Sequence, residues 1–183
     1  RELLTATFDA VERPIALQIY GNDPEVMAEG ARVAEDLGVT ILDLNMGCPS
    51  KRVCAHSGGS ALMKEPQLAR RIIAAMRGAV DLPFTVKMRA GWDPEHENAP
   101  ELARIAEGEG AEGLAVHWRT RTEKYTGTMR LDTIAAVKQA VSIPVLANGD
   151  IVDADSALHV LRQTGVDGLM IGRGAIRNPW VFR

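Results

Sequence analysis

Short apolar runs rich in β-branched residues alternate along this sequence with longer segments in which apolar residues recur at helical spacing. The first pattern is typical of buried strands and the second of amphipathic helices. The strands are expected at residues 15–20, 40–45, 84–89, 113–118, 144–148 and 168–172. Strands that alternate with helices predict a parallel sheet, because the helices then form the crossovers between neighbouring strands.

The helices are expected in the intervals between these strands. Asp23 and Pro24 form a start signal for the first helix, and Gly38 ends it. Further helical patterns occupy residues 66–80, 100–108, 131–141 and 153–165. Six strand–helix units in 183 residues correspond to about 245 residues for eight units, close to the size of a (β/α)8 barrel. We therefore predict an α/β fold, a TIM barrel truncated to about six strand–helix units and forming one partial domain, residues 1–183.

Polar residues near the ends of the strands distinguish this barrel from a doubly wound sheet. Five of them share one phase of the strand alternation: Gln18, Asn45, Lys87, His117 and Asn148. The carboxyl ends of barrel strands surround the active site, so these side chains are expected to converge on one mouth. A doubly wound sheet would carry a Gly-rich dinucleotide motif after its first strand, but residues 20–24 form only a turn into a helix.

Two glycine-containing turns follow the last two expected strands. Asn148, Gly149 and Asp150 form the first turn, and Gly172 and Arg173 begin the second. Barrels commonly bind phosphate with the loops after their last two strands, since glycine lets backbone N–H groups approach and arginine supplies a bidentate cation. The two turns together predict a phosphate-binding site.

Composition and charge limit the classes of protein to which this chain can belong. A hydrophobic content of 46% and a net charge of −3 describe a globular chain with no overall attraction to nucleic acid. The chain has no apolar run of membrane-spanning length, and its N-terminus lacks the features of a signal peptide, so we expect a cytoplasmic protein without membrane contact. RNA binding would have to use local basic patches, Lys51 with Arg52 and residues 119–124, which are otherwise solvated surface charge.

Cys48 lies between Gly47 and Pro49, just after the second expected strand. A metal ligand, half of a disulfide, a buried side chain and a catalytic group are the alternatives. No further cysteine or histidine spacing completes a zinc site around Cys48 and Cys54, and a chain without a secretory signal is expected to keep its thiols reduced. A metal is therefore not expected, and the residues alone leave burial and catalysis open.

A set of motifs runs in order from about residue 15 to residue 183. They are LDLNMGCPSKRV followed by GGSALM, then VKMRAGWDPEH, VHWRTR, VLANGDI and LMIGRGAIRNPWVFR. In this order the motifs resemble those of the tRNA-dihydrouridine synthases, most closely the bacterial B type. The most specific feature is the G-C-P motif with a glycine pair, Gly58 and Gly59, shortly after it.

The resemblance implies an enzyme that reduces the C5=C6 bond of a uridine in tRNA, using FMN that NADPH recharges. Cys48 matches the acid that protonates the base at C5 as hydride arrives at C6 from the flavin. A thiol is mostly protonated at neutral pH and can supply this proton. Cys54 matches no functional position of the family.

The resemblance also assigns residues to the cofactor and the substrate. Lys87 matches the lysine that faces the pyrimidine end of the flavin ring, Gln18 matches a hydrogen-bonding position on the ring, and His117 one close to ring and phosphate. The segments that hold the ribityl chain and phosphate are matched by Asn148, Gly149, Asp150, Gly172 and Arg173. Asn45 matches the substrate side of the flavin, and Arg119 and Arg121 are candidates to meet RNA phosphates.

Two departures from the family pattern accompany the match. The chain corresponds to barrel strands three to eight, so the first two strands and the C-terminal helical tRNA-binding domain are expected to be absent. Trp118 stands where the family usually has glycine. The implied partner is tRNA, and no obligate protein partner is evident.

Two other interpretations stay open. A lysine-dependent barrel aldolase would form a Schiff base at Lys87 and bind a substrate phosphate with the late loops, but it leaves Cys48 without a role. The chain could also be an inactive barrel fragment that serves only as a binding scaffold. Flavin absorbance would favour the synthase, and borohydride trapping of a substrate on Lys87 would favour the aldolase.

Overall fold

A single parallel sheet of six strands forms the centre of the molecule. The computed structural model describes residues 6–123, 126–127 and 129–182, so Lys124 of the basic patch lies outside the described residues. The strands are β1 Ala16–Ile19, β2 Ile41–Met46, β3 Phe84–Arg89, β4 Gly113–His117, β5 Val145–Asn148 and β6 Gly168–Met170. They pair in sequential order and every pair is parallel, which confirms the predicted architecture.

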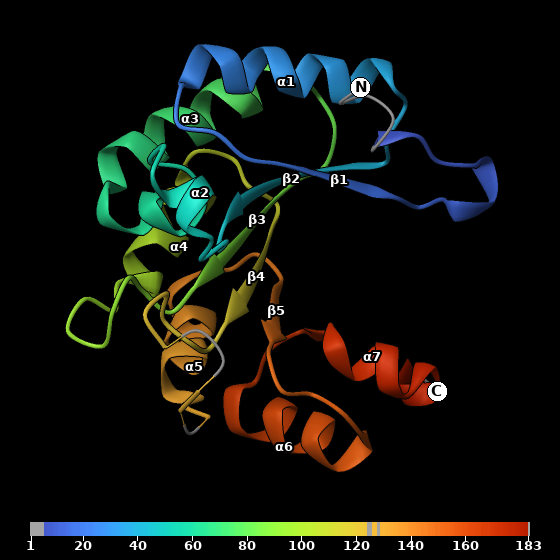
Figure 1. Ribbon diagram of the computed structural model, residues 1–183, viewed down its shortest axis with the longest axis vertical. Helices are drawn as coiled ribbons and strands as arrows, with labels where there is room; N and C mark the ends of the chain where they lie inside the picture. The colour runs from blue at the N-terminus through green and yellow to red at the C-terminus, as the bar shows by residue number, and fades with distance from the viewer. Residues whose placement is uncertain (1–5, 124–125, 128, 183) are drawn as a thin grey trace.

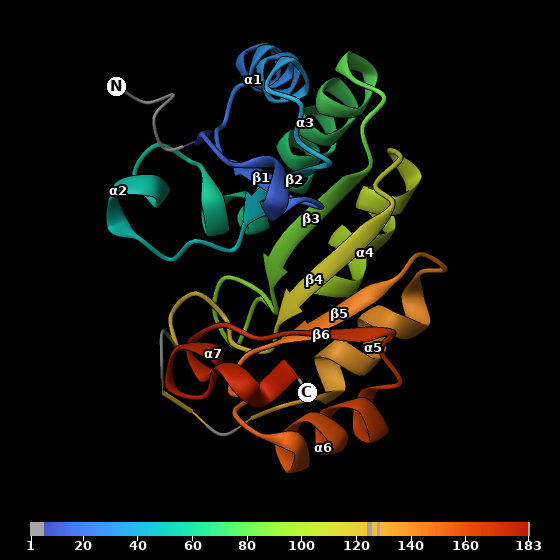
Figure 2. The ribbon, with the colours of Figure 1, turned by 90° about the vertical axis from the view of Figure 1, so that its right-hand side faces the viewer.

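Helices cover one face of the sheet. They are α1 Pro24–Asp36, α3 Pro66–Ala79, α4 Ala99–Gly108, α5 Asp132–Ala140 and α6 Ala154–Thr164. Figure 1 shows them arranged in an arc outside the fanned strands, and Figure 2 shows the strands following one another from β1 to β6. The sheet is therefore a curved arc with a helical outer face and an open concave face.

The alternation of side chains explains why the two faces differ. Every second residue of the inner strands is apolar and fully buried beneath the helices, as Leu44, Val86 and Val116 are. Fully burying such a side chain stabilises the fold by about 1.5–3 kcal/mol. The residues between them point to the concave face, and these include the polar residues singled out in the sequence.

The helix boundaries follow local signals. The Asp23 side chain accepts hydrogen bonds from the N–H groups of Glu25 and Val26, at 2.9 and 3.1 Å, which fixes the start of α1 as the sequence predicts. Gly165 adopts a left-handed conformation, with φ of 67°, at the end of α6. None of the helices in the described part of the chain has the length and apolarity needed to cross a bilayer.

Several short elements were not predicted. They are the helices α2 Lys51–Cys54 and α7 Arg173–Arg177 and the 3-10 segments Ala10–Glu12, Gly59–Lys64 and Pro179–Phe182. The strands β1, β4 and β6 also end earlier than expected, at Ile19, His117 and Met170. The short helices α2 and α7 lie directly beyond the carboxyl ends of β2 and β6, where the candidate site residues lie.

Candidate active site

Three polar side chains form a hydrogen-bonded row across the first three strands. Gln18, Asp43 and Thr85 lie directly opposite one another in the sheet register. Asp43 Oδ2 accepts a hydrogen bond from Gln18 Nε2 at 2.5 Å, and Asp43 Oδ1 accepts one from Thr85 Oγ1 at 2.6 Å. Burial raises the pKa of Asp43, while these hydrogen bonds and the charge of Lys87 oppose that effect. The row holds the Gln18 amide in one orientation.

Asn45 connects this row to the loop that carries Cys48. Its Nδ2 donates to Gln18 Oε1 at 2.6 Å. Its Oδ1 accepts hydrogen bonds from the N–H groups of Gly47 and Cys48, at 3.0 and 2.9 Å. Because an amide nitrogen carries two hydrogens, one Nδ2 hydrogen remains beyond the bond to Gln18. Asn45 thus positions the Cys48 loop and retains one donor.

The Cys48 loop is also held from its other side. The Cys48 carbonyl accepts hydrogen bonds from Ser60 N–H and from Ser60 Oγ, at 3.1 and 2.8 Å. The Cys54 thiol lies 3.5 Å from the same carbonyl and 3.4 Å from Ser60 Oγ. Both cysteines are free thiols. Cys54, which the sequence left without a role, packs against the backbone of Cys48.

Lys87 lies in the middle of the concave face, between Asn45 of β2 and Ala115 of β4 in the sheet register. Burial and the charge of Arg89 lower the pKa of Lys87 to about 8, and the charge of Asp43 acts in the opposite direction. The ammonium form therefore predominates at neutral pH. A cation at this position is suited to an electron-rich or anionic ligand atom.

Arg89 is a site residue that the sequence reasoning missed. Its side chain is only 6% exposed. Its Nε donates to the Gly47 carbonyl at 2.7 Å, and its Nη1 donates to the Thr120 carbonyl at 3.0 Å. One guanidinium thus ties the Cys48 loop to the loop after β4. The sequence does contain a signal for Arg89. It lies two residues after Lys87 on the same strand, so both side chains are expected on the same face of the sheet.

His117, at the end of β4, is a neutral imidazole. Burial, together with the positive charges of Lys87, Arg89, Arg119 and Arg173, lowers its pKa to about 3. The Arg119 backbone N–H donates to His117 Nδ1 at 3.1 Å, so the proton is assigned to Nε2. His117 can therefore donate a hydrogen bond through Nε2 without carrying charge.

Gly149 must be glycine at this place. Its φ is +112°, and a Cβ atom there would lie 2.8 Å from Trp118 Cδ1 and 2.9 Å from His117 Cε1. Trp118 is fully buried, and the indole packs beside the turn that follows β5. Trp118 is thus accommodated because Gly149 carries no side chain.

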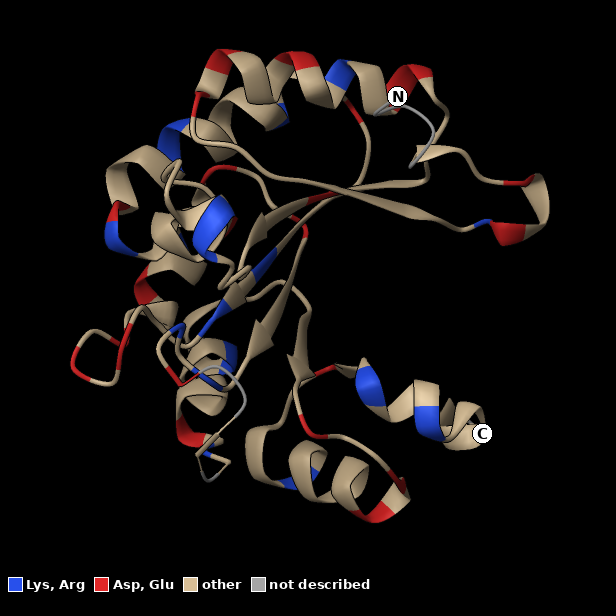
Figure 3. Ribbon diagram, viewed as in Figure 1, with Lys and Arg blue, Asp and Glu red and all other residues tan. Residues whose placement is uncertain are grey.

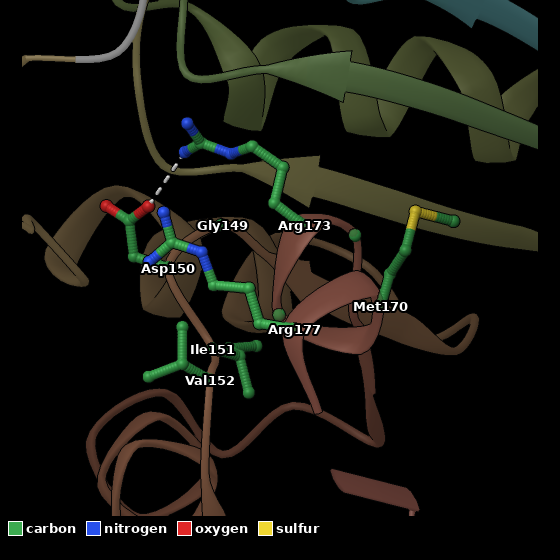
Figure 4. Close-up of a pocket in the computed structure, with 9 residues that line it drawn as sticks. Gly149, Asp150, Ile151, Val152, Met170, Arg173 and Arg177 are labelled. Atoms are coloured by element: carbon green, nitrogen blue, oxygen red, sulfur yellow. Dashed lines mark hydrogen bonds and ion pairs between the residues drawn. The ribbon is translucent and has the colours of Figure 1, made fainter. Parts of the chain in front are cut away.

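The two glycine-containing turns line a cavity of about 190 Å³. Its lining consists of Gly149, Asp150, Ile151, Val152, Met170, Gly172, Arg173, Gly174 and Arg177. In Figure 4 the side chains of Arg173 and Arg177 both extend toward Asp150. Arg173 Nη2 lies 3.2 Å from Asp150 Oδ1. A Cβ on Gly174 would clash with the Ile151 carbonyl oxygen, so the backbones are closely apposed. Two arginines beside bare glycine backbone suit a phosphate group.

The two arginines assigned to RNA have their guanidinium groups in protein contacts. Arg119 is 4% exposed and its Nη2 lies 2.6 Å from Asp150 Oδ2. The Arg121 guanidinium lies 4.6 Å from the ring centre of Trp92. Lys51 and Arg52, in contrast, are exposed on α2. The Arg119 guanidinium is therefore buried, where an RNA phosphate cannot reach it. Its position does not support the predicted contact with RNA.

The remaining predicted residues fall into two neighbouring groups along the carboxyl ends of the strands. Gln18, Asn45, Cys48 and Lys87 form one group. His117, Asn148 and the cavity residues form the other, where Asn148 Nδ2 donates to the Met170 carbonyl at 2.7 Å. Figure 3 shows basic residues within the central strands and on α7, on two sides of the concave face.

Sequential parallel strands, outer helices and polar residues at the carboxyl ends of the strands define a protein of the TIM-barrel class. Solved structures agree on this fold. A putative phosphonomutase from Burkholderia cenocepacia J2315 superimposes with a TM-score of 0.61 at 25% identity, covering 87% of this chain and 69% of that one. A mandelate oxidase gives a TM-score of 0.65 at 21% identity, covering 91% of this chain and 51% of that one.

The sequence profile described as dihydrouridine synthase matches residues 2–183, and the chain belongs to that family. The tRNA-dihydrouridine synthase B of Pseudomonas syringae pv. tomato is 53% identical over 170 residues, 93% of this chain and 50% of the relative. The enzyme of the same name from Shewanella oneidensis is 53% identical over 168 residues, 92% of this chain and 52% of the relative. The chain spans about half the length of the curated relatives it matches.

Proposed function

We propose that the gene product containing this chain, called the full-length protein below, is a tRNA-dihydrouridine synthase. It reduces the C5=C6 bond of a uridine in tRNA to 5,6-dihydrouridine, with FMN as cofactor and NADPH as reductant. The observation that carries this proposal is the Cys48 loop, which Asn45 and Arg89 hold beside Lys87 at the carboxyl ends of the strands. Family membership supports the reaction class.

The residues of the concave face fit FMN at both ends of the cofactor. The cavity between the two glycine-containing turns is lined by Arg173 and Arg177 and suits its phosphate. Lys87, charged at neutral pH, and the oriented amide of Gln18 suit the polar edge of its ring. Neutral His117 lies between these groups with a donor on Nε2. When bound, FMN supplies the hydride.

Cys48 supplies the proton. Hydride addition at C6 of uracil leaves enolate-like charge on the base, and a positioned acid completes the reduction at C5. The hydrogen bonds of the Cys48 backbone to Asn45 and Ser60 fix the loop, so the thiol is presented from a constrained backbone. The remaining Asn45 donor suits a uracil carbonyl. Arg121 and the exposed Lys51 and Arg52 remain candidates for tRNA phosphates.

Mass spectrometry of tRNA tests the proposal. A strain that lacks the full-length gene should lose dihydrouridine at one or more tRNA positions, and the wild-type gene should restore them. The Cys48→Ala gene should not restore them, whereas Cys54→Ala should restore most of the modification. Unchanged dihydrouridine in the deletion strain, in the absence of a second synthase acting at the same position, would refute the proposed function.

The lowered pKa of Lys87 is the one observation that favours the aldolase as a second candidate, because a neutral amine is needed to form a Schiff base. The aldolase interpretation gives the Cys48 loop no role. Borohydride treatment with aldehyde or ketone substrates would trap an adduct on Lys87 if the aldolase reading were right. We expect no adduct, and we expect the purified full-length protein to show flavin absorbance.

A further inference from the structure

The cavity proposed for the cofactor phosphate contains a carboxylate. Asp150 belongs to its lining together with Arg173 and Arg177. An uncompensated carboxylate repels a phosphate held beside it. A phosphate site built around Asp150 therefore requires that the negative charge be neutralised by a group that the phosphate does not itself use.

Arg119 is placed to do this from outside the cavity lining. Its Nη2 lies 2.6 Å from Asp150 Oδ2, while Arg173 reaches the other oxygen, Oδ1, at 3.2 Å. Its Nε donates to the Thr126 carbonyl at 2.8 Å, and its guanidinium lies 4.0 Å from the ring centre of Trp118. These contacts and its 4% exposure leave the guanidinium little freedom to turn elsewhere. The positive charge of Arg119 is therefore held next to the Asp150 carboxylate.

We propose that Arg119 is a positioning residue for the cofactor phosphate, acting as the internal counter-charge of Asp150. The charges of Arg119 and Asp150 nearly cancel, so the cavity keeps a net positive charge from Arg173 and Arg177, although Arg173 also contacts Asp150. This assignment replaces the predicted contact of Arg119 with RNA. It rests on the proposed function, in which the phosphate of FMN occupies this cavity.

FMN and riboflavin separate the phosphate from the rest of the cofactor, because they differ only by that group. In the full-length protein stripped of flavin, Arg119→Met should weaken FMN binding about 10-fold or more, since Asp150 is then balanced only by Arg173, a cation that the phosphate also needs. Riboflavin binding should change by less than about threefold, because no phosphate is present to be repelled. Both affinities are measured by the quenching of flavin fluorescence.

Removal of the Asp150 charge as well should restore the preference for FMN over riboflavin that Arg119→Met loses. The double variant Arg119→Met/Asp150→Asn has no carboxylate to neutralise, so its preference for FMN over riboflavin should return to within about threefold of the parent value. Arg70→Met is the matched control, because Arg70 forms an exposed ion pair with Glu109 away from the cavity. This control should keep both affinities.

The outcomes separate this inference from the proposed function. A parent protein that binds FMN no more tightly than riboflavin would overturn both. A parent that prefers FMN, together with an Arg119→Met variant that retains the preference, would overturn only the role of Arg119. A double variant without the preference would show that Arg119 itself contacts the phosphate or only supports the fold, and this variant alone decides if Arg119→Met does not fold.

Discussion

At the scale of single residues, the backbone of Cys48 is held by hydrogen bonds on both sides. Its N–H group is held by Asn45 and its carbonyl by Ser60, while Arg89 holds the preceding carbonyl of Gly47. Restraint on both sides of the residue fixes where the thiol leaves the backbone. A proton donor works only within hydrogen-bond reach of its target, so this restraint favours a chemical role over simple packing.

Substitution of Cys48 should separate the two half-reactions of the full-length protein. Cys48→Ala should still bind FMN and be reduced by NADPH, because neither step uses the thiol. Formation of dihydrouridine should fall by about 10²- to 10⁴-fold, the usual effect of removing a general acid. Rapid mixing of reduced enzyme with tRNA measures the second step. Product formation by Cys48→Ala at the parental rate would show that the thiol is not the acid.

Lys87 gives the site a dependence on pH. Its pKa in the folded protein is about 8, below the ordinary value of 10.5. Between these values the unfolded chain holds the proton and the folded chain does not, so Lys87 makes the free energy of unfolding rise with pH across that window. FMN binding should change in the opposite direction and weaken as the pH rises through about 8, because the ammonium is lost. Fluorescence titrations of the parent should show this loss, and the same titrations of Lys87→Met should not.

At the scale of elements, the strand pattern of the sequence was sufficient for the sheet and for its polar face. The hydrogen-bonded row of Gln18, Asp43 and Thr85 was not foreseen, because it depends on the register between neighbouring strands. The pattern of one strand tells which face each residue lies on, but not which residue of the neighbouring strand lies opposite it. The ion pair of Arg119 was not foreseen for a similar reason, since its partner Asp150 belongs to a different loop.

The short helices escaped prediction because they are too short to show a period. Four residues in α2 and five in α7 make little more than one turn, so no apolar face recurs along them. Their positions depend on what the preceding strands bring near them. The candidate site residues that the sequence pointed to are those whose strand phase or glycine content is itself informative, such as Lys87 and Gly149.

The turn after β5 should tolerate no side chain at Gly149. Gly149→Ala combines a positive φ with a Cβ that meets His117 and Trp118. We expect the free energy of unfolding to fall by about 1–3 kcal/mol and FMN affinity to fall with it. Urea denaturation and flavin titration measure the two effects. Gly78→Ala in α3 is the control, since a Cβ there meets nothing within 4 Å, and its stability should equal or exceed that of the parent.

At the scale of the whole molecule, the concave face is open to solvent along β1, the edge strand that carries Gln18. Gln18 is exposed, and Tyr20 beyond it is 60% exposed. Within the described residues β1 and β6 each pair with one neighbour, so the sheet is an arc with two edges. Water reaches the face on which the proposed cofactor would lie, and polar contacts there are correspondingly weak.

The 183-residue chain by itself should therefore bind FMN at least about 10-fold more weakly than the full-length protein does. Flavin titration of both proteins under the same conditions makes the comparison. Equal affinities would mean that the six strands described here already contain the entire cofactor site, and that solvent access to the concave face has no effect on binding.

The two sheet edges have a practical consequence for work with this chain. An edge strand presents a row of backbone N–H and C=O groups that can pair with a strand of another molecule. The neighbourhood of β1 offers few of the charged side chains that discourage such pairing, since Ala16, Leu17, Gln18 and Ile19 are all uncharged. Two copies could add strands to one another at these edges, so aggregation during expression and storage is the first difficulty to anticipate, and solubility tags or low protein concentration are the first remedies.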